Sequence, residues 1–378
     1  MVIEPFGREA IEELCGSKIR FSYRDSKQRR MPPSRSGRKR KANEHPWKAR
    51  MDNVTHSLTG ALAATLLQRP SASTSERRTL LWLLVVSANL PDLDVVLQLF
   101  TDRLTYIIHH RGITHSLLFA PVFALVPALV FFSAGKFKRF GVLWSAALVG
   151  IVVHILFDLI TPFGTMIVAP LSQKRFALDW MFIIDPVVTL LLALPFVARI
   201  WAIRRQAMLF RVAGALLILY LAAGALAHHL ALQKVESVAR SASVRVLASS
   251  ALPQPLSIFS WNGLIQTPRG VHRMFFSPFD DTVRVQEFKN EKGKLVDAVL
   301  HEQVVQRYLS FARHPWISLS RNEEGGVVEI QDLQFSVDER VLARFGLPAW
   351  QPPFRLQLVY APDGTLTRAL FDGKQIPR

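Results

Sequence analysis

The chain has 378 residues, a formal net charge of +17 and a hydrophobic fraction of 50%, and its length allows two or three domains. Cys15 is the only cysteine, which excludes an intrachain disulfide and any metal site built from cysteine thiolates. A metal site in this chain would have to be built from histidines and carboxylates.

Residues 1–50 carry much of the positive charge, with 14 Lys and Arg against 6 Asp and Glu. The run Lys27–Lys41 has no hydrophobic periodicity, so we expect a disordered segment. Its charge is compatible with a tail that binds nucleic acid or anionic lipid. A translation start at Met51 is the simpler interpretation, because a basic tail is unfavourable on the outer side of a membrane. We expect no nucleic-acid partner.

Apolar residues gather in long runs up to Leu232, and such runs predict membrane helices. The first helix is short for a membrane span. The expected helices are Thr55–Gln68, Leu80–Phe100, Leu117–Ala134, Val142–Ile160, Met181–Trp201 and Val212–Leu230. The predicted fold class is therefore mainly α, a polytopic α-helical membrane bundle of about six helices within residues 51–232.

The sequence changes character after Leu232. Short apolar or alternating segments predict strands, and the amphipathic segment Ala298–Ala312 predicts a helix. The expected strands are Val244–Val246, Val271–Phe276, Thr282–Phe288, Val327–Phe335, Phe354–Tyr360 and Thr365–Phe371. We expect residues 233–378 to form a soluble α+β domain with its own core.

Basic residues are distributed unevenly between the loops. Loops 69–78, 135–140 and 199–211 hold most of them, and loops 101–114 and 162–179 hold few. Because basic loops face the cytoplasm, we expect a multi-pass protein of the bacterial inner (cytoplasmic) membrane, with the soluble domain outside the cytoplasm.

Histidines and acidic residues lie at the outer ends of successive predicted helices. The richest stretch, Ile108–Ser116, holds three histidines and an arginine beside an apolar run. Ionisable groups at that depth are costly, and clustered histidines usually bind a metal ion. The predicted metal ligands are His56, Asp92, Asp94, His109, His115, His154 and Asp158.

The spacing of the candidates fits ligation. His154 and Asp158 are four residues apart on one helix face, so both side chains can reach one ion. Of the adjacent His109 and His110, we expect only one to face the ion. The candidates exceed the needs of one tetrahedral ion. Either two metals are bound, or the surplus groups support the ligands and transfer protons.

The chemistry of these groups indicates the metal and the catalytic roles. Imidazole with carboxylate suits Zn, which we favour, and also Mn or Fe. We assign catalytic roles to Asp94, His110 and Arg111. A carboxylate outside the ligand set would be the general base, and the planar guanidinium of Arg111 suits an anionic group such as phosphate.

These motifs carry a family resemblance. The segments Asp52–His56, Pro91–Asp94, His109–Ser116 and His154–Asp158 resemble the YdjM-type inner-membrane metal-dependent hydrolase family. The His-His-Arg-Gly-x-Thr-His-Ser run is specific, whereas Pro-Asp-x-Asp alone is not. The resemblance covers roughly Met51 to Asp185, and the C-terminal part looks like an extension that some members carry. It implies a membrane hydrolase.

We therefore predict a membrane-bound metal-dependent hydrolase in which a metal-activated water attacks a phosphoester or lipid-linked ester at the outer membrane face. The first alternative is a divalent-metal carrier or sensor without hydrolysis. The second is a structural membrane protein whose outer domain binds a partner. The apolar segments Leu125–Ala128 and Leu190–Ala193 favour the enzyme, because a transport pathway needs polar residues across the membrane.

Overall fold

The computed structural model describes residues 2–3, 52–200, 206–242, 244–322, 325–344, 346–348 and 352–377. The predicted basic extension lies outside these ranges except for Val2–Ile3, so its disorder stays a prediction. Val2–Ile3 forms β1, which pairs in antiparallel fashion with β2, Arg175–Phe176.

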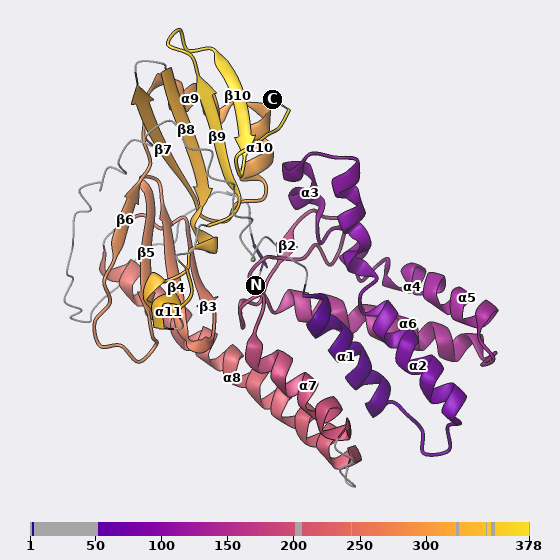
Figure 1. Ribbon diagram of the computed structural model, residues 1–378. Coiled ribbons are helices and arrows are strands. Elements are labelled where there is room, and N and C mark those ends of the chain that lie inside the picture. The colour runs from indigo at the N-terminus through magenta and orange to yellow at the C-terminus, as the bar shows by residue number, and fades with distance from the viewer. Residues whose placement is uncertain are drawn as a thin grey trace.

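Helices make up the first half of the described chain, and two antiparallel sheets stand beside them (Figure 1). The helical elements are α1 (Asn53–Leu66), α2 (Thr74–Ser87), the 3-10 helix η1 (Pro91–Leu99), α3 (Arg103–His109), the 3-10 helix η2 (Ile113–His115), α4 (Ala120–Phe123), α5 (Leu125–Ala134), α6 (Phe140–Leu159), α7 (Pro186–Ile200) and α8 (Gln206–Ser241).

The prediction of about six membrane helices is wrong. Within the described residues, α6 and α8 are long and apolar enough to cross a membrane, and the number rises to four only if each of two bent helix pairs counts as one span. Helices account for 49% and strands for 20% of the structure. The chain is therefore a mixed α and β protein rather than a mainly α bundle.

Helix breaks explain the difference from the prediction. The expected span Leu80–Phe100 bends by 48° between α2 and η1, at Pro91, which has no amide hydrogen to continue a helix. The segment Arg103–His115 meets the next apolar helix at 81°. The expected helix from Met181 begins only at Pro186. Apolar composition alone does not reveal such bends.

The predicted C-terminal α+β domain is present. One sheet has the order β3-β4-β5-β6 and the other β11-β10-β9-β8-β7. The strands are β3 (Ala248–Gln254), β4 (Ser257–Thr267), β5 (Gly270–Phe276), β6 (Gln286–Lys289), β7 (Pro315–Asn322), β8 (Gly325–Asp332), β9 (Arg355–Tyr360), β10 (Leu366–Phe371) and β11 (Lys374–Gln375). The helical elements between them are α9 (Lys294–Leu300), α10 (Gln303–Leu309), the 3-10 helix η3 (Leu333–Phe335) and α11 (Glu339–Arg344).

The sequence located the strands only in part. Strands β5, β8, β9 and β10 lie where they were predicted, whereas Val244–Val246 is not a strand and the strands β4 and β7 were not predicted. The expected helix Ala298–Ala312 is divided into α9 and α10, because Glu302 has extended backbone angles. Helix α8 also continues past Leu232 to Ser241 and packs on β3 and β4.

The C-terminal domain is docked onto the histidine-rich segment. Leu104, Tyr106 and Ile107 of α3 share a hydrophobic core with residues of α9, α10, β8, β9 and β10, and α3 lies beside α10 in Figure 1. Arg313, whose side chain is 8% exposed, also forms a two-pronged ion pair with Asp179, at 2.9 Å for both contacts. The domain therefore holds the segment that leads into His110.

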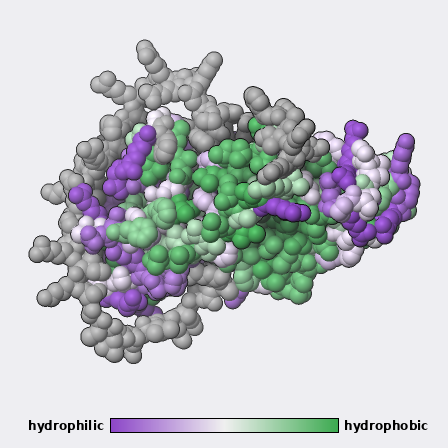
Figure 2. Space-filling view, turned by 90° about the horizontal axis from the view of Figure 1, so that it is seen from below, coloured by the Kyte–Doolittle hydropathy of each residue, from purple (hydrophilic) through white to green (hydrophobic). Residues whose placement is uncertain are grey.

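The surface of the helical part is widely apolar. Figure 2 shows a broad hydrophobic area across the middle of the face seen from below, with hydrophilic residues on both sides of it. Many large apolar side chains of α5, α7 and α8 are exposed, among them Val130, Leu190 and Ile218. Such a surface is unusual in a soluble monomer and is typical of contact with lipid.

Two glycines allow the helices that carry the site to pack closely. A Cβ atom at Gly150 of α6 would lie 2.8 Å from Ser87 Cβ and 3.0 Å from the carbonyl oxygen of Leu84. A Cβ atom at Gly60 of α1 would lie 2.7 Å from the same Leu84 oxygen. Small residues permit this backbone approach between membrane helices. Helices α1 and α6 thus both pack on the end of α2.

We predict that Gly150→Ala destabilises the protein by about 1–3 kcal/mol, because the added methyl group meets backbone atoms that cannot rotate away. Thermal unfolding of the purified protein in detergent would measure the effect. Gly141→Ala is the matched control in the same helix, since a Cβ atom there has nothing within 4 Å. Equal melting temperatures for the two variants would contradict the close packing.

Candidate metal centre

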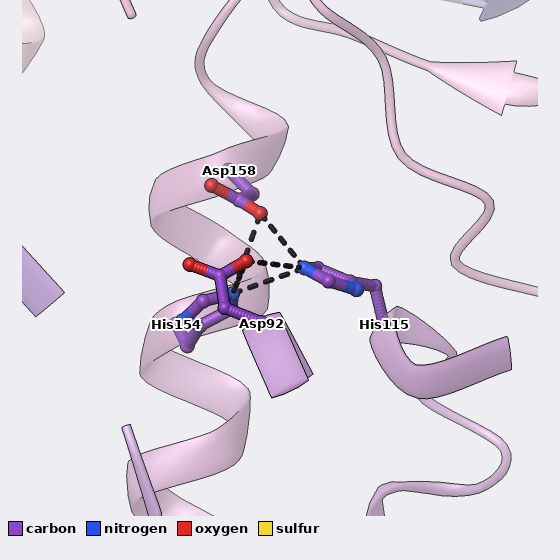
Figure 3. Close-up of side chains that lie close together, drawn as sticks. All are labelled: Asp92, His115, His154 and Asp158. Atoms are coloured by element: carbon purple, nitrogen blue, oxygen red, sulfur yellow. Dashed lines mark hydrogen bonds and ion pairs between the residues drawn. The ribbon is translucent and has the colours of Figure 1, made fainter. Parts of the chain in front are cut away.

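Four buried side chains converge where α6 meets the two broken helices (Figure 3). Asp92 comes from η1, His115 from η2, and His154 and Asp158 from one face of α6. Their side chains are at most 7% exposed. One ligand atom from each lies within 4.8 Å of all the others.

The distances between these atoms match the corners of a tetrahedron. His115 Nε2 lies 3.0 Å from His154 Nε2, 3.1 Å from Asp158 Oδ2 and 3.5 Å from Asp92 Oδ1. His154 Nε2 lies 3.4 Å from Asp158 Oδ2 and 3.6 Å from Asp92 Oδ1. Ligand atoms about 2.0–2.1 Å from a tetrahedral ion are roughly 3.3 Å apart. Five of the six edges are therefore of the right length.

Hydrogen bonds fix the orientation of both imidazoles. His154 Nδ1 lies 2.7 Å from the carbonyl oxygen of Ala88, to which it donates. His115 Nδ1 lies 2.9 Å from Thr114 Oγ1, and this hydroxyl donates to Asp94 Oδ2 at 3.3 Å. Because the hydroxyl has one hydrogen, it accepts from His115. Both rings are thus Nδ1–H tautomers, with the Nε2 lone pairs facing inward.

This arrangement fits a cation at the centre. Two imidazole lone pairs 3.0 Å apart repel each other unless a positive charge lies between them. Buried Asp158 Oδ2 receives no aligned hydrogen bond from the part of the chain that the structure describes, and a buried oxygen without a donor is costly. An imidazole whose second nitrogen donates to a carbonyl is the usual form of a metal ligand. The donor set therefore suits a metal ion.

Arg111 faces the ligand Asp158 rather than open space. Its Nη2 lies 2.8 Å from Asp158 Oδ1, and its Nη1 donates to the Asp158 carbonyl and to Thr161 Oγ1 at 3.2 and 2.9 Å. The guanidinium also lies over the Phe163 ring, 5.0 Å from its centroid. Arg111 thus holds Asp158 in place, and only its buried Nε has no partner among the described residues.

Asp94 and His110 form a pair beside the four ligands. His110 Nδ1 lies 3.0 Å from both carboxylate oxygens of Asp94. Asp94 Oδ2 also accepts from the backbone N–H of Arg111, at 3.2 Å. The His110 side chain is 11% exposed. Together with Asp92, the pair makes a second group whose ligand atoms lie within 4.8 Å of one another.

The remaining predicted ligands have different surroundings. His56 stacks on His154 with ring centroids 3.8 Å apart, and its Nε2 is 3.5 Å from Asp158 Oδ1, so it lies at the edge of the cluster. His109 is exposed and belongs to neither of the two groups. Helix α3 ends at His109, so the chain turns between the adjacent histidines and only His110 points inward.

Arg175 supports the site although it is not among the predicted ligands and catalytic residues. Arg175 is buried and donates to the backbone carbonyls of Gly164, Ile107, Ile108 and His110. Burial and the nearby charge of Arg111 lower the pKa of Arg175 to about 9, so it stays cationic at neutral pH. Its fixed fork of donors ties the histidine-rich loop to β2. The sequence signal was a basic residue in one of the two loops that hold few basic residues.

The fold and the site define a membrane protein with a buried histidine and aspartate cluster that could hold a metal ion. Residues 51–231 match the YdjM inner membrane protein family. The match contains every residue of the cluster. The sheets of the C-terminal domain lie beyond it.

Two curated relatives match parts of the chain. "Uncharacterized protein YfhP" of Bacillus subtilis (strain 168) is 32% identical over 144 residues, which are 36% of this chain and 42% of that protein. "Inner membrane protein YbcI" of Escherichia coli (strain K12) is 35% identical over 103 residues, 26% of this chain and 58% of that protein. The chain thus spans about half the length of these relatives. No solved structure matches it.

We predict that Thr114→Val weakens metal binding roughly 10–100-fold, the usual effect of losing a group that orients a ligand. The methyl group cannot accept from His115 Nδ1, so the imidazole is free to take the other tautomer. Competition with a zinc chelator would measure the affinity. Thr101→Val is the control, since the exposed Thr101 hydroxyl donates to the Leu97 carbonyl, far from the candidate ligands in the hydrogen-bond network of the described residues. Unchanged affinity in Thr114→Val would contradict the tautomer assignment.

Proposed function

We propose that the protein is a metal-dependent hydrolase that cleaves a phosphoester or another lipid-linked ester at the outer face of the bacterial inner membrane. The observation that carries the proposal is the tetrahedral spacing of four buried ligand atoms, from Asp92, His115, His154 and Asp158. A buried cluster of that composition is costly in a membrane protein unless it has a function.

The donor set indicates which ion would bind. Two imidazoles and two carboxylates suit Zn, Mn or Fe, and we propose Zn. A bound divalent ion supplies Lewis acidity, which activates water and polarises a phosphoryl or acyl oxygen. Two of the ligands, Asp92 and His115, come from short 3-10 helices beside a helix break, so the bends that shorten the membrane helices also build the site.

The residues next to the four ligands orient other side chains of the site, and one of them would face the substrate. Arg111 fixes Asp158 by its bond to Oδ1, and this role replaces the predicted contact with phosphate. Asp94 is 2% exposed and contacts His110 through both oxygens, so we assign it the orientation of His110 rather than proton transfer with water. His110 is the partly exposed member of the pair and would face the substrate.

The surroundings of the site favour a substrate with a hydrophobic part. Leu93, Leu97, Leu99 and Phe100 lie on or next to η1, the element that carries Asp92 and Asp94, and are 40–80% exposed. A lipid tail would cover these side chains while the ester reached the ligands. The uneven loop charges support an outer location for the site and for the C-terminal domain.

We predict that removal of the metal by a chelator abolishes hydrolysis of a phosphoester panel, and that added Zn restores it. His154→Ala should lose bound zinc and at least roughly 100-fold in turnover, because one ligand and its alignment are lost together. Metal content and product release would be measured on the same samples in detergent. His109→Ala, which alters an exposed neighbour, should keep both.

The contradicting outcomes separate the alternatives. Stoichiometric zinc with no product from any lipid-linked or soluble ester would favour the metal carrier or sensor over the hydrolase. Activity that survives in His154→Ala and in chelator would exclude this site as the catalytic centre. Preference for a lipid-linked ester over the soluble ester with the same headgroup is the result expected from the apolar surroundings of η1.

A further inference from the structure

The four-ligand site is closed. Four protein groups already satisfy a tetrahedral ion, and the side chains of His115 and His154 have no exposed surface. Protein sites with four ligands are usually structural, whereas catalytic sites keep a position open for water or substrate. A hydrolase built only on this site would have to open it. A second metal-binding position beside the four-ligand site could bind the substrate without any opening of the first site.

The second group of side chains offers such a position. Asp92, Asp94 and His110 each present one ligand atom, and these atoms lie within 4.8 Å of one another. Three protein ligands are the usual complement of a catalytic ion. His110 is the least buried of the three side chains, at 11% exposure against 2% for Asp94 and 7% for Asp92. The open side of this group is therefore the side that His110 borders.

Asp92 belongs to both groups, and its contacts with the imidazoles of the first site are long. Its Oδ1 lies 3.5 and 3.6 Å from His115 Nε2 and His154 Nε2. A carboxylate buried to this degree normally has donors. Neither of these ion-pair distances involves Asp92 Oδ2, so we assign this second oxygen to another cation. A carboxylate shared between two ions would satisfy both oxygens.

Neighbouring groups also fix the orientation of Asp94 and His110, the other two members of the second group. The Arg111 N–H and the Thr114 hydroxyl both donate to Asp94 Oδ2, which leaves Oδ1 with His110 as its neighbour. Tyr106 stacks on the His110 ring, with centroids 5.2 Å apart, and Phe163 packs against its edge. Ligands fixed by neighbours in this way are typical of metal sites.

We propose that Asp92, Asp94 and His110 form a second divalent-cation site, which shares the Asp92 carboxylate with the first and has an open position for the substrate. This inference rests on the proposed function, because the first site must bind its own ion. It assigns the substrate to the second ion and leaves the first ion to hold Asp92 and the two imidazoles in place.

The charges around the site determine how the second ion binds. Three buried carboxylates, of Asp92, Asp94 and Asp158, face two buried guanidinium groups, of Arg111 and Arg175. One divalent ion already outweighs the remaining negative charge. A second ion leaves a positive surplus, which an anionic group at the open position would neutralise. The second ion should therefore bind more tightly when phosphate is present, and phosphate more tightly when the ion is present.

The test measures metal content rather than activity. The full-length protein in detergent is stripped with a chelator, reloaded with Zn in the presence or absence of inorganic phosphate, and analysed for zinc per chain. The expected result is two zinc ions per chain with phosphate and a weaker second ion without it. Asp94→Asn and His110→Ala should bind one, and the control His109→Ala, which changes the exposed adjacent histidine, should bind two.

Each outcome bears on one site. One zinc per chain under all conditions would overturn the second site and leave the proposed function intact, whereas no zinc would refute both. Two zinc ions in His110→Ala would place the second ion elsewhere. Should either variant fail to fold, Mn²⁺ electron paramagnetic resonance of the unaltered protein decides. Two ions that share one carboxylate give a magnetically coupled spectrum, and two uncoupled signals would overturn the shared ligand.

Discussion

Two imidazole lone pairs that point at each other, 3.0 Å apart and out of contact with water, set the main constraint on this protein. The Ala88 carbonyl and the Thr114 hydroxyl hold the two rings in that orientation. The carbonyl is free because α2 has ended there. The helix break before Pro91 thus creates both the acceptor for one ligand and the turn that presents Asp92.

The C-terminal domain belongs to the architecture of the site although it contributes none of the candidate ligands. The short helix α3 is too small to be stable alone, and it buries Leu104, Tyr106 and Ile107 in the core of that domain. Tyr106 in turn stacks on His110. Arg175 lies between the Phe163 and Phe311 rings, at 5.6 and 5.4 Å from their centroids, and so joins the loop to both parts.

The structure brings together several residues that the sequence offered as ligands, whereas the predicted fold class was wrong. His154 and Asp158 follow from helical spacing, and Asp92 follows from the break at Pro91, because both are local properties of the chain. The number of spans failed because hydropathy does not register a bend of 48° or 81°. The sequence also could not decide which of His109 and His110 faces the site. That choice depends on where α3 ends, and α3 packs against a helix some 200 residues further along the chain.

The role of Arg111 could not be predicted from its motif, because it depends on backbone geometry. Its φ is 59°, a left-handed conformation that costs a non-glycine residue about 1 kcal/mol or more and persists only when its surroundings enforce it. Here the backbone N–H donates to Asp94, and the carbonyl accepts from Met166 N at 2.9 Å. This conformation turns the side chain inward to Asp158, while the adjacent His110 remains beside Asp94. The left-handed backbone conformation of Arg111 therefore directs two adjacent side chains to different groups. Arg111 contacts the four-ligand group, and His110 contacts Asp94 in the second group.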